Sequence, residues 1–67
     1  MDAEEIRTEI ESARRLAGWS YQRLAAALDP PVTHAAVLRW LSGDRRLPLA
    51  RAVEMATLMG MRLDVRR

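Results

Sequence analysis

The 67-residue chain contains no cysteine and only one histidine, and this scarcity limits how the chain can be stabilised. A domain of this size buries little apolar surface, so small proteins are commonly reinforced by disulfides, a bound metal or association of subunits. Without cysteine there is no disulfide, and one histidine cannot build a Cys/His zinc site. We therefore expect dimerisation to be the reinforcement that remains.

Aromatic residues are also scarce: there are two tryptophans, one tyrosine and no phenylalanine. Nearly half of the residues are nonetheless apolar, so alanine, leucine, valine, isoleucine and methionine must fill the interior. This composition favours closely packed helices over a β-sandwich. Most of the chain lacks the alternation of apolar and polar residues that a sheet requires. We predict one compact all-α domain over residues 1–67, with four helices or five.

Long apolar runs and reactive side-chain groupings are missing too. No apolar run approaches the roughly 20 residues of a membrane span, and the acidic start lacks the basic segment of a signal peptide. We expect a cytoplasmic protein, complete from Met1, with no membrane partner. The sequence shows no glycine-rich phosphate loop and no evident carboxylate pair. We therefore expect no enzyme, no catalytic residue, no metal, no cofactor and no small-molecule ligand.

The charges that are present are segregated along the chain. Residues 1–11 carry five acids and one arginine, a net charge of −4, whereas residues 12–67 carry ten arginines and four acids, a net charge of +6. All eleven cations are arginine, which binds phosphate and guanine edges better than lysine does. A GC-rich genome would produce the same bias. The acidic start would repel phosphate, so we expect it to point away from nucleic acid or toward a partner protein.

Capping residues and glycines divide the chain into helices. Asp2 and Glu5 have the spacing of a capping box, and Gly18 ends the first helix, which we place at about residues 3–17. Its predicted apolar stripe is Ile6, Ile10, Ala13, Leu16 and Ala17. Ser20 caps a short second helix whose inward residues are Leu24, Ala25 and Leu28, with Tyr21, Gln22 and Arg23 turned outward. Residues 29–31, Asp-Pro-Pro, close that helix and stiffen the turn that follows.

The third helix, capped by Thr33 and ended by Gly43, has an unusual outward face. At 3.6 residues per turn, the inward side takes Ala36, Val37, Trp40 and Leu41, and the other side takes His34, Ala35, Leu38 and Arg39. A solvated face would carry several glutamates and lysines. This one offers an imidazole, a methyl, an isobutyl and a guanidinium group, which suit the polar and methylated floor of the DNA major groove.

A fourth helix and a tail complete the chain. Pro48 is predicted at the first helical position and Gly60 at the end. The predicted stripe of this helix is Leu49, Ala52, Val53, Ala56 and Met59, and Met55 and Met59 are expected to fill gaps in the core. In the tail, residues 61–67, the apolar side chains of Met61, Leu63 and Val65 alternate with polar ones, the period of a half-buried strand. Such a strand would pair with the same segment of a second subunit; the alternative is a frayed extended tail.

Over about residues 6–61 the sequence resembles the lambda-repressor-like or XRE (Cro-type) helix-turn-helix family. The resemblance is carried by Gly18 to Ala25, Leu28, the segment from Val32 to Gly43 with its Trp-Leu-Ser-Gly end, and Pro48 to Met61. In that family the second helix crosses the phosphate backbone and the third reads bases in the major groove. Two departures stand out. The family usually has a single glycine where this chain has Asp29-Pro30-Pro31, and its repressors often continue into a fifth helix that forms the dimer.

The resemblance implies roles for individual residues. The implied base-contacting residues are His34, Ala35, Leu38 and Arg39, and the implied phosphate-contacting residues are Ser20, Tyr21, Gln22, Thr33, Arg45 and Arg46. Trp40 is expected in the core. The implied function is a sequence-specific, Cro-like repressor that binds a palindromic operator in double-stranded DNA as a homodimer, from a phage, plasmid or bacterium. An antitoxin of a toxin–antitoxin pair fits equally well, and a helical adaptor that binds protein instead of DNA is the alternative from another class.

Overall fold

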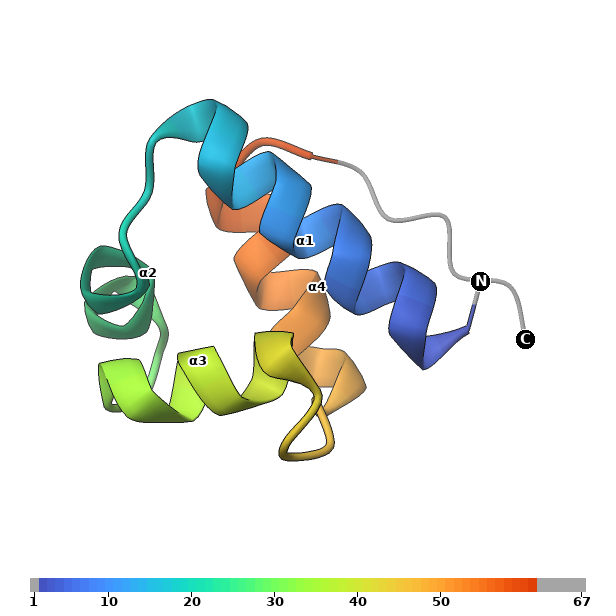
Figure 1. Cartoon of the computed structure of the whole chain (residues 1–67). Helices are drawn as coiled ribbons and strands as arrows, with labels where there is room; N and C mark the ends of the chain where they lie inside the picture. Colours follow the sequence, from blue (N-terminus) through green and yellow to red (C-terminus); the bar gives the residue numbers. More distant parts are fainter. Residues whose placement is uncertain (1, 62–67) are drawn as a thin grey trace.

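The structure, a computed structural model, describes residues 2–61 and contains four helices in that range. They are α1 (Ala3–Ala17), α2 (Tyr21–Ala27), α3 (His34–Ser42) and α4 (Leu49–Leu58). Residues 2–61 contain no strand, so the predicted all-α fold is confirmed. Figure 1 shows α1 and α4 side by side, with α3 along the lower edge of the molecule and α2 seen end-on beside it. Helix α2 packs on α3, and α1 contacts both α3 and α4.

The three predicted N-caps are confirmed by hydrogen bonds. The Asp2 carboxylate accepts from the Glu5 backbone N–H at 2.8 Å, and the Ser20 and Thr33 hydroxyl oxygens accept from Arg23 N–H at 3.0 Å and Ala36 N–H at 3.2 Å. Gly43 ends α3 with φ 89°, in the left-handed region that favours glycine. The chain therefore enters and leaves the third helix where its local chemistry predicts.

The start of α4 differs by one residue from the prediction. Pro48 is not the first helical residue but the N-cap, because its ψ of 137° is extended. Its carbonyl oxygen accepts the first bond of the helix, from Ala52 N–H at 3.0 Å. The helix consequently begins at Leu49.

The core is formed by side chains from all four helices and from the end of α2. Those with almost no exposed surface are Ile10, Leu24, Leu28, Val37 and Met55. Trp40 is only 7% exposed, which confirms its predicted place in the core. Met59 packs against the edge of this core, so Met55 and Met59 both have the packing role predicted for them.

Two of the predicted apolar stripes are partly wrong. Leu16 is 91% exposed, because at 3.6 residues per turn it lies about a third of a turn away from Ile10 and points out of the domain. Ala17 is also exposed, at the end of α1. In α4 the inward face is Ala52, Met55 and Ala56, which leaves Leu49 47% and Val53 46% exposed beside it.

A polar cluster around Glu11 joins α1 to the start of α2. Arg14 donates to both carboxylate oxygens of Glu11, at 2.7 and 3.1 Å, and to the Trp19 carbonyl oxygen at 2.7 Å. The Tyr21 hydroxyl donates to the same carboxylate at 3.0 Å. Hydrogen bonding to Arg14 lowers the pKa of Glu11 below its usual 4.5, and burial raises the pKa of Tyr21. The cluster therefore stabilises the ionised carboxylate.

We predict that Glu11→Gln lowers the free energy of unfolding by about 1–2 kcal/mol at pH 7, the range of a partly exposed charge-assisted hydrogen-bond cluster. Because the pKa of Glu11 is lower in the folded state, its stabilisation is present above pH 4.5 and is lost as the pH falls through the folded-state pKa. The difference between variant and wild type should thus shrink below pH 4.5. Urea unfolding across pH 3–7 measures it, with Glu4→Gln, an exposed glutamate of the same helix, as the control; a pH-independent difference would contradict the prediction.

Candidate nucleic-acid interface

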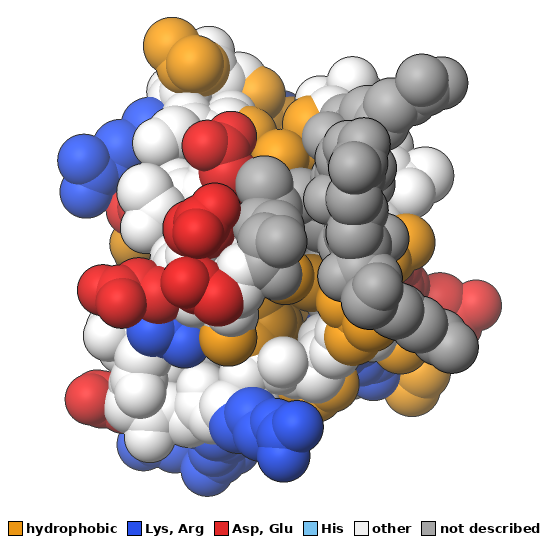
Figure 2. All heavy atoms as spheres, turned by 90° about the vertical axis from the view of Figure 1, so that its right-hand side faces the viewer, with side chains coloured by type: hydrophobic (Ala, Val, Ile, Leu, Met, Phe, Trp, Pro, Cys, Tyr) orange, Lys and Arg blue, Asp and Glu red, His pale blue; other side chains and the backbone are white. Residues whose placement is uncertain are grey.

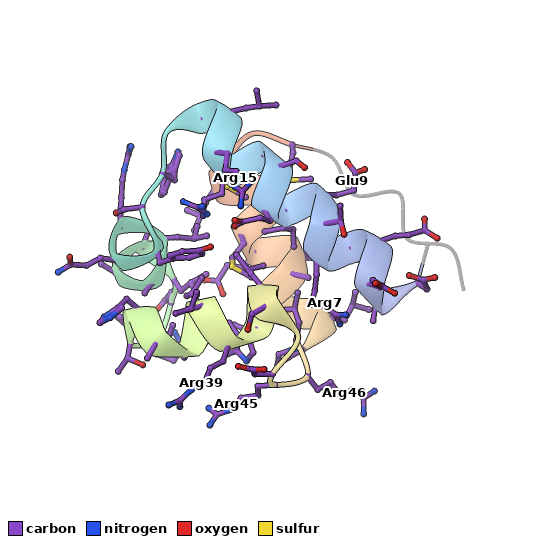
Figure 3. All side chains as sticks on the ribbon, in the orientation of Figure 1. Arg7, Glu9, Arg15, Arg39, Arg45 and Arg46 are labelled. Atoms are coloured by element: carbon purple, nitrogen blue, oxygen red, sulfur yellow. The ribbon has the colours of Figure 1, made fainter. Side chains whose placement is uncertain are left out.

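The side of α3 that faces away from the core carries the predicted base-contacting residues. Val37 and Trp40 are buried on the inner side, while His34 and Arg39 are exposed and Leu38 is 44% exposed. Ala35 is half-buried. In Figure 3 the Arg39 side chain extends below α3, away from the other helices. The helix therefore presents a guanidinium group and an isobutyl group to solvent on one side.

Two further arginines lie on the same side of the molecule, in the loop that follows α3. Figure 3 shows Arg45 below the loop, next to Arg39, and Arg46 on the opposite side of the loop from Arg39. The Arg45 backbone N–H donates to the Arg39 carbonyl oxygen at 3.2 Å, which folds the loop back against the end of α3. Within residues 2–61 no ion pair involves these three side chains. Their charges are thus available to an anionic partner such as a phosphate backbone.

The long turn between α2 and α3 is held by α4. The backbone N–H of Asp29 donates to Glu54 Oε2 at 2.6 Å, and Val32 N–H donates to the Ala25 carbonyl oxygen at 3.2 Å. The Asp29–Pro30 peptide bond is cis. Glu54 also accepts from Arg51 at 2.9 Å, and the pKa of its carboxyl is lowered first by the bond from Asp29 and then by Arg51. The orientation of α3 therefore depends on a carboxylate of another helix.

A family model described as helix-turn-helix matches residues 10–65. The chain belongs to this helix-turn-helix family. The XRE and lambda-repressor type of resemblance is thereby confirmed, and α2, the turn and α3 are its helix-turn-helix unit. Such a unit places its second helix in the DNA major groove, and the family is one of DNA-binding transcription regulators. No curated protein and no solved structure matches the chain.

The remaining predicted contacts of the helix-turn-helix unit differ in what their polar groups already do. Ser20 and Thr33 use their oxygens as helix caps and are exposed, and Gln22 is exposed as well. The prediction that Tyr21 turns outward is wrong, because its ring is half-buried and its hydroxyl donates to Glu11. A phosphate contact by Tyr21 remains a prediction that requires this hydrogen bond to break.

The predicted subunit-joining residues are described only in part. Leu63 and Val65 lie outside the described residues, so the strand prediction stays a prediction. Met61 is described and is half-buried against the core of its own chain, with its backbone N–H donating to the Ala56 carbonyl oxygen at 2.9 Å.

No helix among residues 2–61 is both long enough and apolar enough to cross a membrane.

Sequence reasoning missed two residues that support the helix-turn-helix unit. Glu54 gives no sequence signal because its partner Asp29 is 25 positions away. Arg7, to which the sequence analysis assigned no role, packs its guanidinium group over Gly43, 3.6 Å from the point where a side chain there would begin. A positive charge at the C-terminal end of α3 is favoured by the helix dipole. Because α1 carries both glutamates and arginines along its length, its sequence does not indicate which arginine turns inward.

We predict that Glu54→Ala loosens the turn and weakens binding to a specific duplex by about tenfold, because α3 loses the anchor that orients it. Glu54→Gln should restore most of the affinity, since its amide oxygen can accept from Asp29 N–H. Arg51→Ala is the matched control, because it removes the ion pair but leaves the bond to the turn. Amide hydrogen exchange at Asp29 should rise in Glu54→Ala alone; unchanged exchange there would show that Glu54 does not hold the turn.

Proposed function

We propose that this protein is a sequence-specific transcription repressor that binds a palindromic operator as a homodimer. The observation that carries the proposal is the exposed side of α3, with Arg39 pointing outward and Arg45 and Arg46 on the same side (Figure 3). Two copies would place their α3 helices in major grooves about one helical turn apart. Occupation of a promoter would then exclude polymerase. We place this activity in the bacterial cytoplasm or nucleoid.

In this proposal the residues divide into two groups. Arg39 donates to guanine O6 and N7, and His34 contacts a base edge near the start of α3. Ala35 and Leu38 contact thymine methyl groups. The phosphate contacts position the domain without reading sequence, and they come from Ser20, Tyr21, Gln22, Thr33, Arg45 and Arg46.

Two other functions are compatible with parts of the molecule. An antitoxin of a toxin–antitoxin pair would bind its own promoter through the same surface, and its distinguishing feature is a toxin partner. A protein-binding adaptor is favoured by the acidic start of α1, since residues 2–9 precede the family match. Titration with random duplex separates the classes, because the adaptor predicts no binding. Selection of bound oligonucleotides from a random pool would then supply the operator for the tests below.

We predict that Arg39→Ala reduces discrimination at one base pair of the selected operator by about 1–3 kcal/mol, the contribution of one bidentate contact to guanine. Binding to random duplex should change much less. Arg15→Ala is the control, because Arg15 is an exposed arginine of α1 that lies well away from Arg39 and Arg45 (Figure 3). Fluorescence anisotropy with the operator and its single-base variants makes the measurement. Equal losses on every sequence would overturn the base-reading role of Arg39.

Arg45→Ala combined with Arg46→Ala should weaken binding evenly on all duplexes. The plot of log affinity against log salt concentration should become shallower by about 0.9 for each phosphate that the variant no longer neutralises. Titrations at four salt concentrations, with operator and random duplex in parallel, test this expectation. An unchanged slope would show that these two arginines do not neutralise phosphates.

A further inference from the structure

The face of the molecule that carries the N-terminal ends of α1 and α4 contains a groove with an apolar lining. The groove has a volume of about 500 Å³, and the apolar residues that line it are Ala3, Ile6, Leu47, Pro48, Leu49 and Ala52. Figure 2 shows apolar side chains in the middle of this face, with arginines below them. Sites for small molecules have volumes of roughly 300–1,000 Å³ and are lined mostly by apolar side chains. The groove therefore has the size and the lining of a small-molecule site.

The charged side chains of the groove are both arginines. Arg7 comes from α1 and Arg46 from the loop after α3. Figure 3 shows both on the right-hand side of the molecule, away from Arg39 and Arg45. Within residues 2–61 neither guanidinium group forms an ion pair, and no acidic residue lines the groove. The described part of the groove is therefore complementary to an anion.

The rest of the lining narrows the chemistry of that anion. None of the described lining residues has a hydroxyl, an amide or an aromatic ring in its side chain. A sugar or a nucleotide would bury polar groups that these side chains cannot pair, which costs free energy. A planar ring would find no aromatic side chain to stack on. An alkyl chain needs only apolar contact, so the lining fits an aliphatic chain that ends in an anionic group.

The two arginines connect the groove to the DNA-binding unit. The Arg7 guanidinium group packs over Gly43, the residue that ends α3. Arg46 is one of the predicted phosphate contacts. A carboxylate in the groove would accept charge-assisted hydrogen bonds from these guanidinium groups. An Arg46 side chain that is paired with a carboxylate is no longer free to neutralise a phosphate, so a ligand in the groove and a DNA strand compete for it.

We propose that the groove binds a free aliphatic carboxylate, whose head group is held by Arg7 and Arg46, and that this ligand weakens DNA binding. The effect on DNA rests on the proposed function, but the ligand site itself requires no DNA. The sequence predicts no small-molecule ligand, because the groove forms only when α1, the loop after α3 and α4 come together. By linkage, the ligand lowers the affinity for DNA by the same factor as DNA lowers the affinity for the ligand.

Titration of the full chain with octanoate, followed by calorimetry and amide chemical shifts, tests the site. We expect shifts at residues 3–7 and 46–52. Octanoate should bind about tenfold more tightly than octanol or octyltrimethylammonium, which have the same alkyl chain but no negative charge. Hexanoate should bind more weakly, by about twofold or more for each methylene removed. Equal binding of the three head groups, or binding only at concentrations that form micelles, would overturn the proposal.

Substitutions in the groove test its contacts with the ligand. Arg7→Gln and Arg46→Gln should each weaken octanoate binding by about fivefold to tenfold, whereas Arg45→Gln, the neighbouring arginine that does not line the groove, should leave it unchanged. Ala3→Leu enlarges an exposed lining residue and should block octanoate binding while circular dichroism stays that of wild type. Wild-type octanoate affinity in Ala3→Leu, or equal losses in Arg45→Gln and Arg46→Gln, would contradict the assignment.

Anisotropy titrations with the selected operator at constant ionic strength test the effect on DNA. Saturating octanoate should weaken operator binding by about tenfold, and octanol at the same concentration should not. Ala3→Leu should bind the operator as wild type does and should not respond to octanoate. Unchanged operator affinity of the octanoate-bound protein would overturn the regulatory effect. A protein that binds octanoate in the groove but binds no duplex would keep the ligand site and overturn the proposed function.

Two results would assign the groove to a different occupant and overturn the proposal. If octanoate does not bind and Leu49→Glu dissociates a dimer in sedimentation velocity, the groove belongs to a second copy of the chain. Leu16→Glu is the matched control there, because Leu16 is an exposed leucine that does not line the groove. If octanoate does not bind and a peptide of leucine and glutamate shifts the same amides, the groove belongs to an acidic partner protein.

Discussion

Burial of one side of α3 is the constraint on which the rest of the structure depends. Val37 and Trp40 enter the core, and they leave Leu38 and Arg39 no position except the outer surface. The helix has only nine residues, so it has little stability of its own and owes its orientation to this packing. The outward direction of Arg39 therefore follows from the aromatic side chain of the same helix that is anchored inside the domain.

The elements that could be predicted from sequence are those set by local chemistry. Asp2, Ser20 and Thr33 cap the helices as predicted because a cap needs only an oxygen and a nearby N–H. The outward direction of Arg39 was also predictable, since the period of α3 is clear once Val37 and Trp40 are assigned to the core. The family resemblance added the expected roles of these residues, and the helix-turn-helix match confirms the family.

The features that sequence reasoning missed depend on interactions between distant parts of the chain. Leu16 fits an apolar stripe, but no neighbouring helix covers it within residues 2–61. Tyr21 was expected outside, yet the paired Glu11 and Arg14 offer its hydroxyl an acceptor. Glu54 looks like an ordinary surface charge in the sequence, whereas the long Asp-Pro-Pro turn exposes a backbone N–H that it satisfies. Periodicity within one helix contains no information about such partners.

Helix α4 influences the helix-turn-helix unit without being part of it. Its Glu54 accepts from the Asp29 backbone N–H and so holds the turn that leads into α3. In the proposed homodimer the separation of the two α3 helices would set the spacing of the half-sites, and a site lengthened by one base pair would turn one half-site away from its helix by about a tenth of a turn.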